Sequence, residues 1–188
     1  MLSGRPVKRA AVSFSRHPIM FTEMLVLVAL PLLLAVAAGW DIASFTIPNF
    51  VNLALAAVFA VFALSAGLSF SAIGWHLVAG IAALAVGFAL FATGHIGGGD
   101  AKLFAAIALW LGLKDCLPYA LLASLFGGGL ALLLIIWRQW PLPAFLLRYG
   151  WIVKLHDSKA GIPYGVALAA GVFILLPSTE IFRLAAAA

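Results

Sequence analysis

The long apolar segments of this sequence constrain its fold more than any other feature. Of the 188 residues, 65% are hydrophobic and only 9% are charged, which leaves too little polar surface to cover a water-soluble globule. A helix needs about 20 apolar residues to cross a bilayer. Six windows reach or approach that length, at 19–40, 50–70, 73–92, 101–113, 116–137 and 162–182. The sequence therefore predicts an all-α, polytopic membrane protein with about six transmembrane helices.

The chain reads as one domain preceded by a short tail. We expect residues 1–18 to form a basic N-terminal tail and residues 19–184 to form a single six-helix transmembrane domain. Within that domain, residues 138–161 mix apolar and basic side chains, which predicts an amphipathic loop at the membrane interface. The glycine run at 127–129 is expected to permit close packing between helices.

The window 101–113 is shorter than a membrane span. A helix of that length reaches only about 20 Å, against the ~30 Å of the hydrocarbon core. Either the helix continues through Lys114 and Asp115 with a kink near Pro118, or the glycine-rich stretch before Ala101 dips into the membrane. Irregular backbone at that depth requires protein or water to satisfy its polar groups.

The charges and the cysteine content exclude several kinds of partner. The net charge is +5, but the basic residues lie at segment ends, where they act as topology signals rather than as a nucleic-acid surface. Cys116 is the single cysteine, and no cysteine–histidine cluster has the spacing of a zinc site. We expect the lipid bilayer as a partner, and no nucleic acid, metal or cofactor. The oligomeric state stays open.

Two of the six acidic residues stand out by their positions. Asp41 closes the first apolar window and Asp100 opens the fourth, and a carboxylate in or near a bilayer is costly enough to suggest a function. Because two windows lie between them, both acids return to one membrane face. Taken singly, Asp100 is equally well an ordinary N-cap and Asp41 an interfacial anchor. The other four acids lie near segment ends or basic residues: Glu23, Asp115, Asp157 and Glu180.

A pair of carboxylates supplies both a base and an acid. Two carboxylates within hydrogen-bond reach cannot both ionise readily, so one of them stays protonated. The ionised member can deprotonate a water while the protonated member donates to a scissile carbonyl oxygen. Gly97, Gly98 and Gly99 precede Asp100. Without side chains they leave room for a substrate backbone and can take positive φ.

Three motifs together resemble the prepilin peptidase family, the GxGD class of membrane aspartyl proteases. They are Asp41 followed by Ile47-Pro48-Asn49, then Gly97-Gly98-Gly99-Asp100-Ala101-Lys102, then Ile162-Pro163-Tyr164-Gly165, which is similar to the Pro-Tyr-Gly signature opening the family's last helix. The resemblance implies that Asp41 and Asp100 are catalytic and cleave the leader peptide of type IV prepilins or pseudopilins. Residues expected to support the site or bind substrate are Pro48, Asn49, Gly97, Gly99, Lys102, Tyr164 and Gly165.

The supporting residues each have a structural interpretation as well. We expect Asn49 to orient the loop after Asp41 by hydrogen bonding, whereas Pro48 has the alternative role of simply ending a helix. Lys102 either acts on a nearby carboxylate or extends to the lipid headgroups. Tyr164 and Gly165 either line the substrate groove or simply start the last helix.

The resemblance narrows further to a short form of the family. Larger relatives carry a cytosolic domain with paired CxxC motifs and also methylate the new N-terminus. Here about forty residues precede Asp41 and contain no cysteine, whereas a typical domain has ~100 residues. The chain resembles the peptidase-only form of tight-adherence (Flp) pilus systems, an endopeptidase without N-methyltransferase activity.

The resemblance also implies a bacterial inner membrane protein with a cytoplasmic active face. The basic leader of a prepilin stays on the cytoplasmic side. Charge by itself is nearly balanced between the two faces. The side of the two aspartates would carry Lys102, Arg138, Arg148, Lys154 and Lys159, and the other side Arg5, Lys8, Arg9, Arg16, Lys114 and Arg183.

Three other functions remain as alternatives. A small transporter or channel would use the buried acids to bind ions or relay protons. An intramembrane protease of the presenilin or signal-peptide-peptidase type shares GxGD, but it places its aspartates on adjacent helices and carries a Pro-Ala-Leu motif. A non-catalytic pilus-assembly scaffold gives no reason for paired membrane acids.

Overall fold

The fold is entirely helical over the part of the chain that the computed structural model describes, residues 17–187. This confirms the predicted all-α class. Most of the predicted basic tail, residues 1–16, lies outside the described residues, and so do its four basic side chains. Three helices of the described range are long and apolar enough to cross a membrane, and a bent pair gives a fourth.

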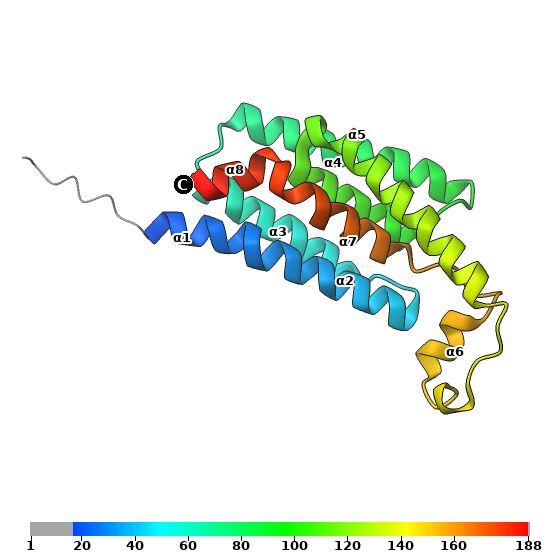
Figure 1. Cartoon of the computed structure of the whole chain (residues 1–188). Coiled ribbons are helices and arrows are strands. Elements are labelled where there is room, and N and C mark those ends of the chain that lie inside the picture. The colour runs from blue at the N-terminus through cyan, green and yellow to red at the C-terminus, as the bar shows by residue number, and fades with distance from the viewer. Residues whose placement is uncertain (1–16, 188) are drawn as a thin grey trace, which may run out of the picture.

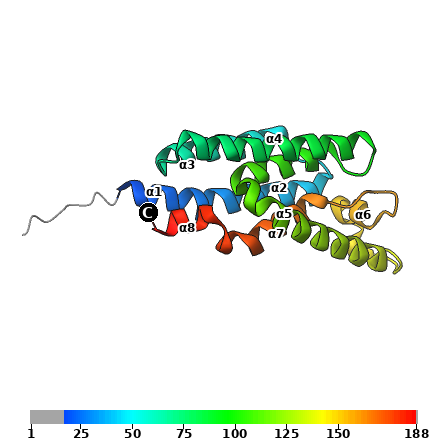
Figure 2. The same ribbon diagram turned by 90° about the horizontal axis from the view of Figure 1, so that it is seen from above.

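Apolar helical segments run alternately up and down (Figures 1 and 2). The first is α1 (His17–Met24), η1 (Leu25–Ala29) and α2 (Leu30–Ser44), followed by α3 (Asn49–Ser65), α4 (Phe70–Ala92) and α5 (Gly98–Trp137). After a connection with η2 (Ala144–Leu146) and α6 (Gly150–His156), the last comprises α7 (Tyr164–Leu175), η3 (Leu176–Ser178) and α8 (Glu180–Ala187). With α5 counted as two arms, these are six segments, as predicted.

The first segment contains a π-helical turn directly before a proline. Pro31 is the second residue of α2, and the π-helix η1 ends two residues earlier, at Ala29. Proline has no N–H to donate and its ring crowds the preceding turn. A widened turn at this point lets the helix continue past Pro31.

Helix α5 continues through Lys114 and Asp115, as the first explanation of the short window predicted, but its break lies at Gly112 rather than near Pro118. Gly112 has φ 72° and ψ 175°, a combination that essentially only glycine adopts. Residues 98–111 form a first arm and residues 113–137 a second arm that packs against it, as the stacked rings of Phe104 and Tyr119 show at 5.4 Å. The chain reverses at Gly112 (Figure 1), so Lys114 and Asp115 begin the second arm.

A side chain from α4 supports this reversal. Nδ1 of His76 donates to the carbonyl oxygen of Leu109 at 2.8 Å, satisfying a carbonyl at the end of the first arm. A Cβ at position 112 would lie 3.2 Å from the same imidazole ring. His76 is therefore a structural residue of the reversal.

Two other predicted windows differ from the observed helices. Helix α3 ends at Ser65 rather than near 70, because Gly67 takes φ 66° and turns the chain toward α4. The window 162–182 is interrupted by η3, which contains Pro177, and the helices on either side are bent by 55°. Both changes follow from glycine and proline inside apolar runs, where hydropathy gives no signal.

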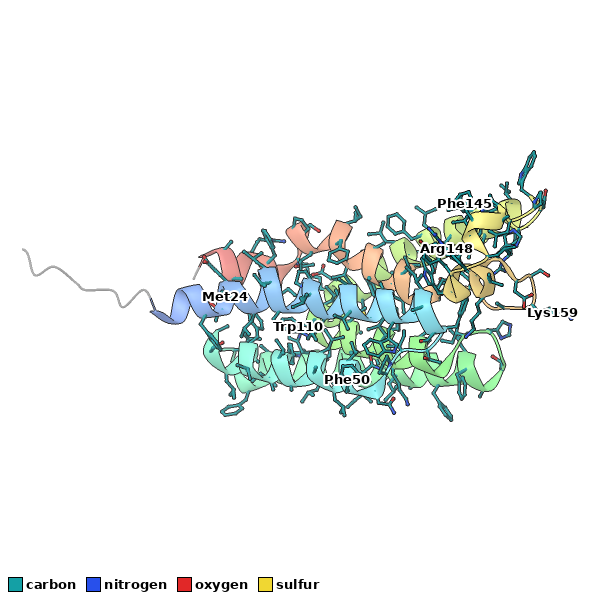
Figure 3. The ribbon with its side chains drawn as sticks, turned by 90° about the horizontal axis from the view of Figure 1, so that it is seen from below. Met24, Phe50, Trp110, Phe145, Arg148 and Lys159 are labelled. Atoms are coloured by element: carbon teal, nitrogen blue, oxygen red, sulfur yellow. The ribbon has the colours of Figure 1, made fainter. Side chains whose placement is uncertain are left out.

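Trp110 is the central side chain of the bundle. It is fully buried, its indole N–H donates to the Leu55 carbonyl at 2.9 Å, and its ring stacks on Phe62. Figure 3 shows Trp110 between the helices, whereas Phe145 and Lys159 lie in the connection beyond the end of α5. The first arm of α5 is thus anchored inside the bundle, where it presents its N-terminus to the site.

Small residues bring α4 close to that arm. A Cβ on Gly87 would lie 3.0 Å from the Cβ of Ala101, and one on Gly80 would lie 3.2 Å from the Cβ of Leu109. Glycine and alanine at helix contacts permit such close approach inside membranes. The position of Asp100, one residue before Ala101, is set by this contact.

Candidate active site

Asp41 lies in the last turn of α2, with only 4% of its surface exposed. Its Oδ2 accepts a hydrogen bond of 2.6 Å from the backbone N–H of Gly165, in the first turn of α7. The first N–H groups of a helix have no partner within the helix, and the N-terminus favours a carboxylate. This hydrogen bond therefore joins the Asp41 motif to the Pro-Tyr-Gly motif.

The chain leaves α2 through a left-handed residue beside Asp41. Phe45 has φ 58° and its N–H donates to the carbonyl oxygen of Asp41 at 2.7 Å. Bulky residues rarely adopt this conformation, and such outliers gather at functional sites. The Phe45 ring faces Nζ of Lys154 at 5.1 Å, and the same Nζ donates to the Ser44 carbonyl. The long connection thus supports the end of α2.

Asp100 lies at the start of α5, at its third helical position. The N-cap is Gly97, so Asp100 is not the N-cap itself. Its carboxylate turns back and accepts a hydrogen bond from the Gly97 backbone N–H, a geometry that satisfies one free donor of the helix start. Asp100 is also close enough to Asp41 for their charges to interact.

The glycine motif serves close packing rather than positive φ. Residues 97–99 do not use the positive φ that glycine can adopt, since Gly97 has φ −72° and the next two residues are helical. A Cβ on Gly97 would lie 2.8 Å from Oδ2 of Asp100, and one on Gly99 3.3 Å from the Cβ and N of Ile47. The protein's own atoms therefore occupy the room that was expected for substrate at these two positions.

The two aspartates line one cavity of about 290 Å³. Its other walls come from residues 45–47, the glycines at 97–99, Asn49 and Lys102. The cavity lies where the end of α2 meets the starts of α3 and α5. Besides the aspartates, five predicted site residues line this cavity or pack against its walls: Asn49, Gly97, Gly99, Lys102 and Gly165.

Lys102 and Asn49 form a polar contact at the edge of this cavity. Nζ of Lys102 donates to Oδ1 of Asn49 at 2.9 Å, joining α5 to the first residue of α3. Asn49 therefore binds Lys102 and not the loop after Asp41. Pro48 does not end a helix, since α2 ends at Ser44 and Pro48 is the N-cap residue of α3; it is also absent from the cavity walls.

Tyr164 lies apart from the cavity that the two aspartates line. Its hydroxyl donates to the Ala123 carbonyl at 3.3 Å, and its ring covers Gly127, where a Cβ would lie 2.2 Å from a ring carbon. Of the run 127–129, only Gly127 is needed for packing, since nothing lies within 4 Å of a Cβ at the other two. Tyr164 and Asp100 both line a second cavity of about 210 Å³.

Ile47 is a site residue that the sequence interpretation missed. It is 7% exposed and lies between Gly99 and Gly165, whose added Cβ atoms would reach its Cβ and its Cδ1 at 3.3 and 3.0 Å. The sequence feature that could have identified Ile47 as a site residue is its place in the Ile47-Pro48-Asn49 motif. Ile47 fills the space between the two motif glycines and so fixes their separation.

No group of three histidine, cysteine, aspartate or glutamate side chains that could hold a metal ion occurs within residues 17–187. The acids of the cavity are Asp41 and Asp100. The chemistry that this arrangement offers is proton transfer between a pair of carboxylates with water-sized space beside them.

The family model described as the type IV leader peptidase family matches residues 28–132. The match includes both aspartates, Asn49 and Lys102, whereas Tyr164 and Gly165 lie beyond it. None of the curated proteins and none of the solved structures matches the chain.

Proposed function

Because the chain belongs to the type IV leader peptidase family, whose model covers more than half of it, we propose that it is a membrane-embedded aspartic endopeptidase. Membership in the family implies a peptidase. The proposed substrates are type IV prepilins or pseudopilins of the Flp type, and the proposed catalytic residues are Asp41 and Asp100.

The shared cavity of the two aspartates carries this proposal. One carboxylate, ionised, takes a proton from water as the water oxygen attacks the scissile carbonyl carbon. The other, protonated, gives its proton to the carbonyl oxygen. The tetrahedral intermediate then loses its C–N bond, and the amine leaves with the proton that the first carboxylate had taken. The second carboxylate takes a proton back from one hydroxyl group as the new carboxyl group forms. No covalent bond to the enzyme forms.

The test uses purified protein in detergent, mixed with an Flp-type precursor. We expect the wild-type protein to release the leader, and Asp41→Asn and Asp100→Asn to fold but cleave at least about a hundredfold more slowly. Asp115→Asn and Asp157→Asn are matched controls, since these acids lie outside the cavity. Cleavage at the wild-type rate by either cavity variant would exclude the assigned pair.

We further propose cleavage without N-methylation. The sequence has one cysteine, Cys116, and so no paired CxxC motif. The mature N-terminus should therefore leave the reaction with a free amine, even when a methyl donor is added. Mass spectrometry of the released product decides this.

The proposed location is the bacterial inner membrane, with the cavity at the cytoplasmic face. The cavity end of the structure carries Lys102 and the basic residues of the connection, which include Arg138 and Lys154. Cytoplasmic ends of membrane proteins are enriched in lysine and arginine. A basic leader held on that side would reach the aspartates without crossing the membrane.

A further inference from the structure

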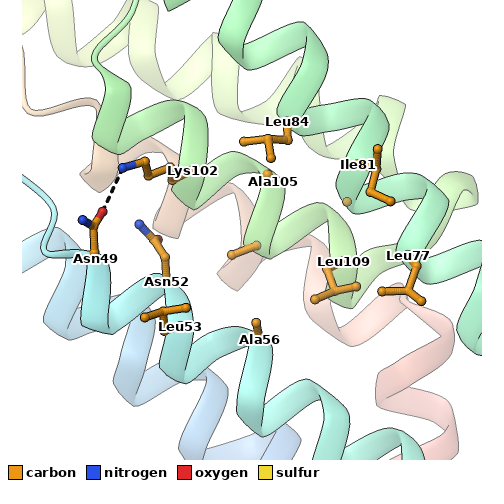
Figure 4. A pocket seen from close by; sticks show the side chains of 12 residues that line it. Asn49, Asn52, Leu53, Ala56, Leu77, Ile81, Leu84, Lys102, Ala105 and Leu109 are labelled. Atoms are coloured by element: carbon orange, nitrogen blue, oxygen red, sulfur yellow. Dashed lines mark hydrogen bonds between the residues drawn. The ribbon is translucent and has the colours of Figure 1, made fainter.

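An apolar groove begins beside the catalytic cavity and runs between α3 and α4. Its volume is about 490 Å³, and the first arm of α5 forms its floor. Leu53 and Ala56 line it from α3, and Leu77 and Ile81 from α4 (Figure 4). Leu53 and Ile81 are 69% and 66% exposed, so the groove opens on the lipid-facing side of the helices.

The groove is continuous with the catalytic cavity. Asn49 and Lys102 line both spaces, and their hydrogen bond stands where the two meet (Figure 4). One end of the groove is therefore polar and adjoins the aspartates, whereas the remainder is apolar. A bound peptide that is polar beside the aspartates and apolar farther along the groove would match this arrangement.

Asn52 is the unexplained residue of the groove. Both its amide nitrogen and its amide oxygen are buried and have no hydrogen-bond partner among the described residues. Figure 4 shows its side chain pointing from α3 toward the first arm of α5, beside the Lys102–Asn49 contact. Leaving a buried amide without a partner is destabilising. The presence of Asn52 in an apolar wall indicates that a molecule entering the groove supplies its hydrogen-bond partner.

We propose that the groove between α3 and α4 binds the start of the substrate's apolar helix, and that Asn52 hydrogen-bonds to the free backbone groups there. This inference rests on the proposed function. A peptide bond is hydrolysed in an extended segment, so a helix that follows the cleaved bond begins near the aspartates. Its first four N–H groups have no partner within that helix.

Those backbone groups are costly where water is scarce. An unsatisfied N–H in the bilayer costs several kcal/mol, and asparagine is among the best partners for the start of a helix. The amide of Asn52 offers an acceptor for such N–H groups and donors for a neighbouring carbonyl. For the substrate backbone to reach the Asn52 amide, the hydrogen bond from Lys102 to Asn49 breaks. This loses one contact between side chains and disturbs no helix.

The second cavity, beside Asp100 and Tyr164, is a poorer site for this helix. It is smaller, at about 210 Å³. Its hydroxyl groups already have partners, because Ser124 donates to the Ala120 carbonyl and Tyr164 to the Ala123 carbonyl. These hydroxyls retain acceptor capacity only, whereas the Asn52 amide offers an entering backbone both an acceptor and donors.

The first test separates substrate binding from stability. Asn52→Leu replaces an unpartnered amide by an apolar group of similar size, so we expect its melting temperature in detergent to equal or exceed that of the wild type. Its kcat/KM on a full-length Flp-type precursor should fall at least tenfold. An unchanged kcat/KM would overturn the role of Asn52, and so would an equal loss on a short peptide that ends a few residues after the cleaved bond, before the apolar helix.

The second test fills the groove. Ala56→Trp places a large ring in it, whereas Ala57→Trp puts the same ring on the exposed neighbouring position outside it. With Ala56→Trp, KM for the full-length precursor should rise at least tenfold, while the short peptide is cleaved as by the wild type. Equal KM values for the two variants would overturn the groove as the binding site.

The third test does not require cleavage. A photo-crosslinking amino acid replaces Ile81 in the groove or Leu90 in the second cavity, each in the Asp41→Asn variant reconstituted in phospholipid vesicles with precursor. We expect precursor crosslinks from position 81 and few from position 90. Crosslinks from position 81 to lipid alone, or to precursor only from position 90, would overturn the groove. A wild-type protein that cleaves no precursor would overturn the proposed function as well.

Discussion

The backbone N–H of Gly165 donates a 2.6 Å hydrogen bond to Oδ2 of Asp41, across 124 positions of sequence. This contact ties the start of the last segment to the end of the first. A Cβ on Gly165 would lie 2.9 Å from the same oxygen and 3.2 Å from the Cβ of Asp41. The position of the Asp41 carboxylate therefore depends on residue 165 having no side chain.

Gly165→Ala is expected to move the Asp41 carboxylate out of place. On the proposed function, kcat for an Flp-type precursor should fall at least about tenfold, because displacing a reacting group by about 1 Å has large effects on rate. KM should change little, and circular dichroism should show a helical protein. Gly161→Ala is the matched control, since nothing lies within 4 Å of its added Cβ. Equal kcat values for the two variants would contradict the positioning role.

Gly97→Ala is expected to act on the other carboxylate. The added Cβ would lie 2.8 Å from Oδ2 of Asp100, whereas one on Gly98 would meet only the Phe91 ring, at 3.4 Å. We expect Gly97→Ala to lower kcat at least about tenfold and Gly98→Ala to lower it less. Steady-state kinetics on one precursor compares them, and a larger loss in Gly98→Ala would be inconsistent with this geometry.

Gly127→Ala is expected to destabilise the protein. Its Cβ would overlap the Tyr164 ring, and overpacking of this kind costs about 1–3 kcal/mol. Gly128→Ala, with no neighbour within 4 Å, should unfold at or above the wild-type temperature. Combining Gly127→Ala with Tyr164→Ala should cost less than the sum of the two single changes, and strict additivity in thermal unfolding would rule out the predicted overlap.

Gly112→Ala tests the reversal of α5. Alanine at φ 72° and ψ 175° costs about 1–3 kcal/mol, so the melting temperature in detergent should drop. Gly39→Ala, in the exposed middle of α2, should instead stabilise by about 0.5–1 kcal/mol. If both variants shifted the melting temperature in the same direction, the strained reversal would be refuted.

The orientation can be read from a fusion after Ala188. If the cavity faces the cytoplasm, α8 lies toward the opposite face, because Figure 1 shows α8 at the far end of the bundle from α6. An alkaline phosphatase fused there should be active, and green fluorescent protein fused there should be dark. The reverse pattern would place the cavity in the periplasm and would contradict the proposed cytoplasmic active face.

The sequence predicted the membrane class and the approximate number of segments, because hydropathy is a local property of the chain. It also predicted that Asp41 and Asp100 return to one end of the molecule, since an even number of spans separates them. What it did not predict is where apolar runs break. Gly112 and Pro177 lie within apolar runs, and only their packed surroundings decide whether such residues end a helix.

The contacts of the site, too, were only partly predicted from the sequence. Motif order placed Asp41, Asp100 and Gly165 in one region by resemblance, but it did not reveal that Gly97 and Gly99 serve close approach. It left Ile47 unassigned.

The sequence by itself determined which residues lie at the cavity end, because hydropathy and charge are read along the chain. Only the tertiary structure decided that the Gly165 N–H binds Asp41 and that Lys102 binds Asn49. The physical reason is that hydrogen bonds and close packing act over a few ångströms between helices, at separations that no local pattern of residues encodes.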